Sequence, residues 1–456
     1  MRGGPTVMKF GGTSVGDADA LRRLAEIVAE RAELRPIVVV SAMSRFTDAL
    51  VAAVRLAGEE DVAGAVATLA PHLDRHAAAA RGLLPRGDAD EVARAVDAAR
   101  GELADLLRIA AAHPGTRAPL HDEVVAYGER LSSLLVAAVL RGGGLRGRQV
   151  DARRCVRTTP EHRRAEPLAG PTREACRAEL LPAVEAGEVP VMGGFIGSAL
   201  SGATTTLGRG GSDFSAALVG AAVDAAEIQI WTDVTGFLTA DPRVVPEARR
   251  IGRLSYAEAA ELAFFGAKVL HPRTIEPAVE RGIPVRVCNS REPAEEGTRI
   301  GARAEEAPQG VKAIAHKAGV TVVQVTAARM LGAFGFMRAI FEVFERHRTP
   351  VDVVATSEVS VSLSLEDRED LSAIFAELRG LGTVEVEEGN AIVCVVGEGL
   401  RSTPGVAGRV FGALPDVNVR MISQGASRLN LTFVVDESRA REVVARLHGE
   451  FFGSAS

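Results

Sequence analysis

The sequence has few cysteines, no long apolar run and little net charge, and each absence excludes a class of protein. Its 456 residues include four cysteines, none in a CxxC pair, which we interpret as reduced thiols. The longest apolar runs, such as Leu134–Leu140, are too short to cross a bilayer. Residues 1–8 lack the pattern of a signal peptide, and the net charge of −6 indicates no nucleic-acid surface. We therefore expect a soluble cytoplasmic protein with no membrane or nucleic-acid partner.

The glycine-rich stretch Gly193–Ser215 is the most informative part of the chain. A short apolar segment, Val189–Met192, leads into it, and a run of small residues typical of a helix follows. Glycines allow backbone N–H groups to approach a ligand closely, and a helix N-terminus carries positive partial charge. A second loop of this kind, KFGGTS at Lys9–Ser14, precedes the helical pattern Ala18–Glu33. Two such loops carrying Lys9 and Arg209 predict a phosphate site.

The first 290 residues alternate short apolar strands with helical patterns, which indicates an α/β domain with a mostly parallel sheet. Several polar residues directly follow predicted strands, where ligands bind in open α/β sheets: Lys9, Ser41, Thr205, Arg209, Asp213, Thr232 and Asp233. We also predict one long helix over Asp122–Leu140, solvated positions for His72 and His76, a last strand at Pro284–Val287 and a linker over Thr298–Pro308.

Beyond residue 310 the strands and helices follow the order βαββαβ, which is typical of a ferredoxin-like unit. A second, incomplete copy follows, and its missing strand is supplied by Val311–Ala315. We infer that the first copy is inserted into the second. The predicted domains are therefore 1–300, then a linker and strand over 301–316, the first ferredoxin-like unit over 317–390, and the rest of the second over 391–456.

With these motifs in view, the sequence closely resembles the monofunctional aspartate kinases, in which an amino-acid-kinase domain precedes two ACT domains. The motifs that carry the resemblance are KFGGTS (9–14), SAMSRFTD (41–48), GERLSSLL (128–135), GFIG…TTTLGRGGSD (194–213), WTDVTGFLTADPRVV (231–245), FGAKVLHP (265–272) and MLGAFGF…VDVVATSEVSVSLSL (330–365). The resemblance implies that ATP, with Mg²⁺ on its phosphates, phosphorylates the side-chain carboxylate of L-aspartate to give 4-phospho-L-aspartate, the first step of lysine, threonine and methionine biosynthesis.

The resemblance also implies roles for individual residues. Lys9 and the amides of Gly11 and Gly12 would hold the transferring phosphate, and Asp213 would orient the lysine. Glu129 would bind the α-ammonium of aspartate and Arg209 its α-carboxylate. The other implied aspartate-binding residues are Ser41, Thr47 and Thr205, and the implied nucleotide-binding residues are Lys9, Gly211, Ser212, Thr232, Asp233, Arg243 and Lys268. Asp48 replaces an asparagine that is common near the aspartate pocket of the family.

The double ACT tail implies feedback control by an amino acid. Lysine is the expected effector, and threonine, both together, or no inhibition stay open. The implied effector site comprises Met330, Phe336, Val351, Asp352, Ser357 and Glu358. ACT sheets have exposed edges, so we expect a homodimer formed through them, with a tetramer also open.

The proposed chemistry needs no general base, because a carboxylate is already ionised at neutral pH. In agreement, neither glycine loop contains His or Cys. Two alternatives stay open at this point: a related kinase acting on glutamate or acetylglutamate, and a non-catalytic amino-acid sensor. The first would lack the ACT tail, and the second would have damaged phosphate loops. No Walker P-loop and no protein-kinase motif set occurs.

Overall fold

The fold was analysed in a computed structural model, which describes residues 3–266, 270, 272–304, 310–331, 334–366 and 371–453. The chain forms two compact units. The first unit comprises Met1–Phe237, Gly252–Tyr256 and Val269–Ala304, and the second comprises Leu238–Ile251, Ala257–Lys268 and Glu305–Ser456. No helix among the described residues is long and apolar enough to span a membrane.

The first unit is built on an eight-stranded sheet with the order β3-β5-β2-β1-β8-β10-β11-β9. All neighbouring strands are parallel except β10 and β11. The strands are β1 (Thr6–Phe10), β2 (Pro36–Val40), β3 (Gly147–Val150), β5 (Val189–Gly193), β8 (Glu227–Thr232), β9 (Arg253–Ser255), β10 (Val285–Asn289) and β11 (Thr298–Gly301). β1, β2 and β5 are buried along their whole length, as their continuous apolar runs predict.

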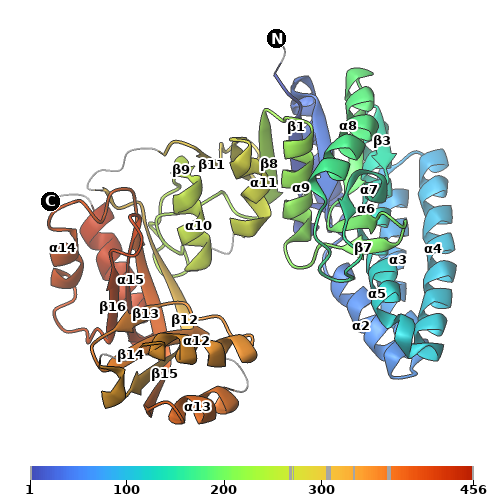
Figure 1. Ribbon diagram of the computed structural model, residues 1–456. Helices are drawn as coiled ribbons and strands as arrows, with labels where there is room; N and C mark the ends of the chain where they lie inside the picture. The colour runs from blue at the N-terminus through green and yellow to red at the C-terminus, as the bar shows by residue number, and fades with distance from the viewer. Residues whose placement is uncertain are drawn as a thin grey trace. The chain divides into compact units, whose positions relative to one another are not determined.

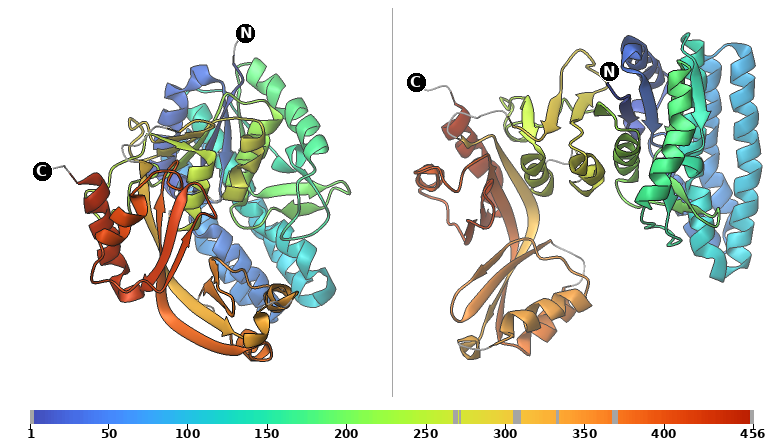
Figure 2. Two further views of the ribbon diagram at one scale, coloured as in Figure 1. Left: turned by 60° about the vertical axis from the view of Figure 1, so that its left-hand side comes forward. Right: turned by 45° about the horizontal axis from the view of Figure 1, so that its top comes forward.

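Helices cover both faces of this sheet (Figure 1). α8 and α9 lie on one face and α1 and α6 on the other, with the long α3–α4 pair beyond α6 (Figure 2). The bounds are α1 (Ala18–Glu30), α2 (Phe46–Gly58), α3 (Val62–Leu83), α4 (Arg86–Ala112), α5 (Arg117–Val125), α6 (Tyr127–Gly142), α7 (Ala152–Cys155), α8 (Ala169–Glu185), α9 (Gly211–Ala222) and α11 (Glu276–Glu280). A smaller sheet contains β4 (Arg157–Thr158), β6 (Ile196–Ala199) and β7 (Thr204–Thr206).

Three local predictions for this unit are wrong. The single helix predicted over Asp122–Leu140 is two helices, α5 and α6, that meet at Ala126. The break is slight, because Ala126 keeps right-handed helical angles of φ −60° and ψ −22°. Pro284–Val287 is not the last strand, because Thr298–Gly301, the start of the predicted linker, pairs with β10 as β11.

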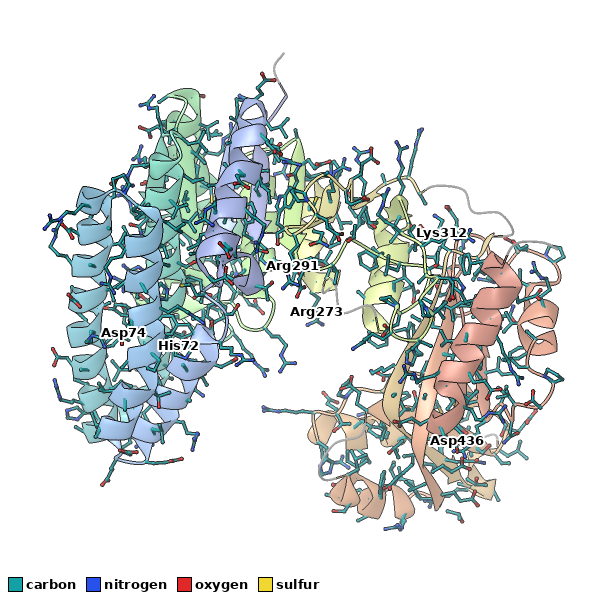
Figure 3. All side chains as sticks on the ribbon, turned by 180° about the vertical axis from the view of Figure 1, so that it is seen from behind. His72, Asp74, Arg273, Arg291, Lys312 and Asp436 are labelled. Carbon is teal, nitrogen blue, oxygen red and sulfur yellow. The ribbon has the colours of Figure 1, made fainter. Side chains whose placement is uncertain are left out.

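The histidine prediction for the α3–α4 pair is also wrong. His76 is completely buried, and the rings of His72 and His76 both pack against Phe46, with centroids 5.4 and 5.1 Å away. Figure 3 labels His72 on its helix. Burial lowers the pKa of His76 to about 4, so this side chain is a neutral core residue. The alanine-rich sequence around these histidines gives no indication that Phe46, from another helix, packs against them.

The second unit is organised around one antiparallel six-stranded sheet with the order β13-β14-β12-β15-β17-β16. Its strands are β12 (Ala313–Thr326), β13 (Val354–Thr356), β14 (Ser360–Glu366), β15 (Thr383–Val396), β16 (Met421–Gln424) and β17 (Asn430–Asp436). Its helices are α10 (Tyr256–Phe264), α12 (Phe336–Arg346), α13 (Ser372–Arg379), α14 (Val406–Gly412) and α15 (Glu437–Phe452). The first residue of α10, Tyr256, belongs to the first unit, and the rest of the helix belongs to the second.

Each half of this sheet has its own core, with α12 and α13 on one half and α14 and α15 on the other. The two halves share the long strands β12 and β15 (Figure 2). Residues Ala313–Lys317 of β12 pair with Ile392–Val396 of β15, so the start of β12 belongs to the second half. The insertion of one repeat into the other therefore produces a continuous sheet.

Part of the sequence before residue 300 groups with this second unit. The segment Leu238–Ile251 lies there: Ala240 and Val245 join the core of the second half, and the amide of Ile314 donates to the carbonyl of Thr239 at 2.8 Å. The motif over 231–245 is thus divided between the two units after Phe237.

Candidate active site

The site of the first unit lies where the parallel strands end. The amide of Ser41 donates to the carbonyl of Phe10 at 3.0 Å, and that of Gly194 donates to the carbonyl of Val40 at 2.8 Å. These bonds hold the loops after β1, β2 and β5 against one another. Ligands of open α/β sheets bind at this edge.

A cleft of about 520 Å³ opens at this edge. Eight residues predicted for the site line it: Lys9, Ser41, Thr47, Glu129, Arg209, Gly211, Ser212 and Asp213. Asp48, His121, Arg163, Phe195, Thr206, Gly208 and Gly210 complete the lining. The structure therefore brings together residues that are up to 204 positions apart in the sequence, since Lys9 and Asp213 are the most distant of the predicted set.

Glu129 lies in the first turn of α6 and is only 3% exposed. Glycines allow this close packing, because a Cβ on Gly128 would lie 2.8 Å from the Ala42 side chain and one on Gly193 would lie 2.8 Å from that of Glu129. Oε1 accepts a hydrogen bond from the amide of Ala42 at 3.2 Å, whereas Oε2 has no partner among the described residues. Burial raises the pKa of Glu129 to about 8. The free oxygen suits a cationic group of a ligand.

Lys9 and Asp213 form an ion pair of 2.7 Å between Nζ and Oδ1. Lys9 lies on β1, and Asp213 lies in the first turn of α9. The loop before α9 turns through Gly208 and Gly210, with φ angles of 77° and 74° that favour glycine. A buried ammonium beside a helix N-terminus is a suitable place for a phosphate group.

A buried carboxylate, Asp122, connects three parts of the cleft wall. It accepts hydrogen bonds from the rings of His121 and His162 at 3.2 and 3.0 Å and from the amide of Arg163 at 2.9 Å. Thr206 donates to it through both its amide and its hydroxyl. Burial raises the pKa of Asp122, but these hydrogen bonds outweigh that effect and the pKa is lowered overall. Asp122 is therefore an ionised anchor for α5, the loop over 159–168 and β7.

Two predicted contributions to the site need correction. Thr205 is completely buried and its hydroxyl shares a hydrogen bond of 2.7 Å with that of Thr158; Thr206 lines the cleft instead, because side chains alternate along β7. The amide of Gly11 donates to the carbonyl of Trp231 at 3.1 Å, so this amide already has an acceptor and is not free for phosphate.

The predicted nucleotide residues are only partly described. The hydroxyl of Thr232 donates to Asp233 at 3.2 Å at the end of β8, and neither residue is part of the cleft. Arg243 belongs to the second unit, where its exposed guanidinium binds both oxygens of Asp241. Lys268 lies outside the described residues.

Seven cleft residues had no role among those predicted for the site: Asp48, His121, Arg163, Phe195, Thr206, Gly208 and Gly210. Thr206 could have been found from the alternation of the three threonines. Neither His121 nor Arg163 belongs to a motif that predicts a site. Their hydrogen bonds to buried Asp122 hold them at the cleft, and nothing in the sequence indicates that Asp122 has this role.

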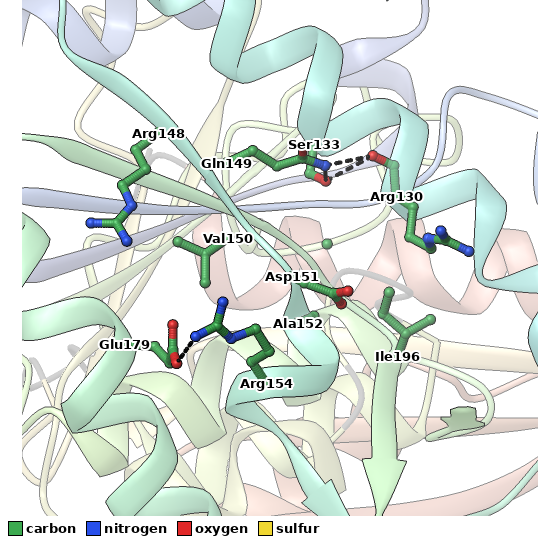
Figure 4. Close-up of a pocket in the computed structure, with 11 residues that line it drawn as sticks. Arg130, Ser133, Arg148, Gln149, Val150, Asp151, Ala152, Arg154, Glu179 and Ile196 are labelled. Carbon is green, nitrogen blue, oxygen red and sulfur yellow. Dashed lines mark hydrogen bonds and ion pairs between the residues drawn. The ribbon is translucent and has the colours of Figure 1, made fainter. Parts of the chain in front are cut away.

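A second cavity of about 370 Å³ lies beside β3 (Figure 4). Its three arginines all have partners within the chain. Arg154 pairs with Glu179 at 2.7 Å, Arg148 with Glu188 at 3.3 Å, and Arg130 lies over the ring of Tyr127 at 4.3 Å. Because each of these guanidinium groups already has a partner, this cavity offers a ligand no unpaired positive charge, unlike the first cleft.

The predicted effector residues lie in the first half of the second unit. Asp352 pairs with Lys317 at 2.7 Å, and Lys317 also pairs with Glu366 at 2.7 Å. Burial lowers the pKa of Lys317, but the hydrogen bonds to the two carboxylates outweigh it and raise the pKa overall. Ser357 and Glu358 are exposed at the turn between β13 and β14, and Met330, Phe336 and Val351 are partly buried. An ammonium is thus already bound at Asp352.

Comparisons with known proteins agree with this architecture. Residues 4–289 match the amino acid kinase family, and residues 393–451 match the ACT domain. The fold and the site define an amino acid kinase joined to an ACT-type unit. Lysine-sensitive aspartokinase 3 of Escherichia coli (strain K12) is 41% identical over 454 residues, which cover 98% of this chain and 99% of that protein. The aspartokinase of Schizosaccharomyces pombe (strain 972 / ATCC 24843) is 34% identical, with 98% and 92% covered.

Solved structures show the same similarity. Aspartokinase III of E. coli in complex with aspartate and ADP has a TM-score of 0.82 at 39% identity, covering 98% of this chain and all of that one. The same enzyme in complex with lysine and aspartate has a TM-score of 0.84 at 39% identity, with 98% and 99% covered. The chain belongs to the aspartokinases of the amino acid kinase family.

Proposed function

We propose that this chain transfers the γ-phosphoryl group of ATP to the side-chain carboxylate of L-aspartate, giving ADP and 4-phospho-L-aspartate. The observation that carries the proposal is the composition of the cleft, in which a buried carboxylate with one free oxygen shares a cavity with arginines and a buried lysine. A dicarboxylic amino acid with a free ammonium complements this set. The E. coli relative bound to aspartate and ADP supports it.

The amino-acid end of the substrate is bound by opposite charges. Glu129 takes the α-ammonium with its free Oε2, and Arg209 takes the α-carboxylate, for which a guanidinium provides paired donors. Ser41 and Thr47 add hydroxyl groups at the cleft wall. An acetylated substrate has no ammonium and would leave Glu129 buried without a partner, which disfavours acetylglutamate.

The transferring phosphoryl group lies between Lys9 and the N-terminus of α9. Phosphoryl transfer is catalysed mainly by positioning and by stabilisation of charge, and Lys9 supplies a cation whose position Asp213 fixes at 2.7 Å. The side-chain carboxylate of aspartate is the nucleophile and is ionised without a base.

Mg²⁺ fits this site as an ion carried by the ATP phosphates. Magnesium in kinases is usually held through few carboxylates, and the described residues contain no cluster of three or more His, Cys, Asp or Glu that could enclose a metal. Asp213 and Asp233 are the carboxylates that would orient its water ligands. When bound, the ion neutralises charge on the phosphates.

The test of the reaction is ADP release by the purified protein with Mg²⁺·ATP and L-aspartate, L-glutamate or N-acetyl-L-glutamate in parallel. We expect turnover with aspartate alone. The acyl phosphate product can be trapped with hydroxylamine and identified by chromatography. Turnover with another acceptor in preference to aspartate would contradict the proposed substrate. Binding of amino acids without any turnover would favour a sensor.

We propose lysine as the feedback inhibitor, bound in the first half of the second unit near Asp352 and Glu358. The lysine-sensitive relative supports this choice. The pairing of Asp352 with Lys317 supports it further, since this site already holds an alkylammonium between two carboxylates. The segment 231–245 runs from the end of β8, beside the proposed nucleotide residues, directly into the second unit. This covalent connection is the proposed link between lysine binding and the active site.

Glu358→Ala is expected to raise the lysine concentration for half-inhibition by about 10-fold or more, because an ion pair to the effector is lost, with kcat unchanged. The measurement is initial rate against lysine at fixed aspartate and ATP. Glu388→Ala removes another exposed glutamate of the same unit and serves as the control. Equal inhibition of the two variants would reject this effector site.

We further propose a homodimer formed through the exposed sheet edges β13 and β16, and a cytoplasmic location. Unpaired edge strands favour pairing between chains, and the four cysteines are all free and buried, which fits a reducing compartment. Light scattering on the purified protein gives the oligomeric state directly.

A further inference from the structure

Arg163 is a cation of the active cleft whose role the family motifs do not assign. It lies in the loop between β4 and α8 and lines the same cleft as Glu129 and Arg209. Its side chain is exposed, and its guanidinium forms no hydrogen bond or ion pair with any of the residues that the structure describes. An unpaired arginine facing a ligand cleft is available to an anion.

The backbone of Arg163 is held in place from two sides. Its amide donates to Asp122 at 2.9 Å, and the neighbouring His162 ring donates to the same carboxylate. Two residues later, the amide of Ala165 donates to the carbonyl of Thr206 at 3.0 Å. Asp122 itself is completely buried. The loop is therefore fixed to the cleft wall.

The conformation held in this way is an unfavourable one for arginine. Arg163 has a φ angle of 70°, in the left-handed region where residues with a Cβ are strained and glycine is not. Such strain persists where the surrounding structure imposes it, and it is concentrated at functional sites. Six other described residues that are not glycine have a positive φ, so the strain supports a role for Arg163 only together with its place in the cleft.

The charges of the cleft indicate what that use is. Three carboxylates line the cleft, Asp48, Glu129 and Asp213, and three side chains carry fixed positive charge, Lys9, Arg163 and Arg209. Lys9 is already paired with Asp213. Because the raised pKa keeps Glu129 protonated below pH 8, Arg163 makes the lining positive overall, and without it the lining would be neutral. A positive lining attracts aspartate, which has two carboxylates and one ammonium.

We propose that Arg163 binds a carboxylate of the amino-acid substrate together with Arg209. This inference rests on the proposed function and adds a residue that determines its substrate affinity. Neither Thr232 nor Asp233 belongs to this cleft, whereas Lys9 and Gly211 do, so only the phosphates of the nucleotide compete with the substrate carboxylate for Arg163. The KM for ATP distinguishes the two partners.

The test compares the wild-type enzyme with Arg163→Gly, which removes the guanidinium and also relieves the backbone strain. We expect KM for aspartate to rise about 10-fold, as for the loss of a charge-assisted hydrogen bond, while KM for ATP changes less than 2-fold and kcat little. The melting temperature should be unchanged or higher. Arg163→Lys should restore part of the affinity, since it keeps the charge.

Glu60→Gly is the matched control, because Glu60 has a φ of 67° and is exposed but does not line the cleft. It should relieve strain without changing either KM. If Arg163→Gly and Glu60→Gly share the wild-type KM for aspartate, the inference is wrong although the proposed function stands. If the wild-type enzyme does not phosphorylate aspartate, the proposed function fails and this inference fails with it.

Discussion

Lys9→Ala is expected to lower kcat by about 10²–10³-fold, the usual cost of removing one preorganised donor from a developing negative charge. Lys9 is a buried ammonium beside the N-terminus of α9, positioned by its ion pair with Asp213. The charge of the phosphoryl group is greatest at this place in the proposed transition state. The KM for aspartate should change much less, because Glu129 and Arg209 are the proposed partners of its amino-acid end. Steady-state kinetics with both substrates varied give these values.

Two further variants separate catalysis from folding in this experiment. Lys9→Met keeps the aliphatic part of the side chain and should lose kcat as Lys9→Ala does, with a melting temperature that identifies any loss of packing. Asp213→Asn leaves the lysine in place but removes its orienting charge, so a smaller loss of kcat is expected. Turnover near the wild-type rate in Lys9→Met would refute the role assigned to Lys9.

Glu129→Gln is expected to lower kcat/KM for aspartate by about 10²–10³-fold, since it removes one partner of the proposed buried ion pair with the substrate. The same change should stabilise the free protein. In the wild type a carboxylate with one unpartnered oxygen is buried at 3% exposure, and burial of a charge without a partner is unfavourable. Kinetics and urea denaturation of the two proteins measure the two effects, which have opposite signs.

The pH dependence of stability follows from the raised pKa of Glu129, about 8 in the folded protein against an ordinary value of 4.5. Below pH 4.5 the carboxyl is protonated in both states and has no effect. Between 4.5 and 8 the unfolded state loses the proton and the folded state keeps it, so the free energy of unfolding falls as the pH rises. The stabilisation by Glu129→Gln should therefore be larger at pH 8 than at pH 5. A gain independent of pH would contradict the assignment.

The pH dependence of binding has the opposite direction. In the proposed complex the ammonium of aspartate pairs with ionised Glu129, so the free enzyme would release a proton when it binds aspartate below pH 8. The KM for aspartate should consequently decrease as the pH rises toward 8, and this slope should disappear in Glu129→Gln. His121 also lines the cleft, so His121→Gln is the control, in which the slope should persist.

The cleft contains residues that could be predicted from their neighbours in the sequence and residues that are placed there only by contacts with distant segments. Lys9, Arg209 and Asp213 could be predicted because glycines and strand ends mark phosphate loops within a few residues. Arg163 could not, because it reaches the cleft only through Asp122, which lies 41 positions earlier. Thr205 and Thr206 look equivalent as sequence, and the pairing of β7 with β6 decides which one faces the cleft.

The sequence by itself determined the alternation of strands and helices, the two glycine loops and the repeat of the C-terminal unit, because these depend on hydrophobic periodicity and on backbone freedom within short segments. Only the tertiary structure decided that β12 and β15 are shared by both halves of one sheet and that His76 is buried. It alone decided that Leu238–Ile251 joins the second unit. The physical reason is that pairing, burial and charge neutralisation depend on which distant segments meet, and a single segment carries no record of its partner.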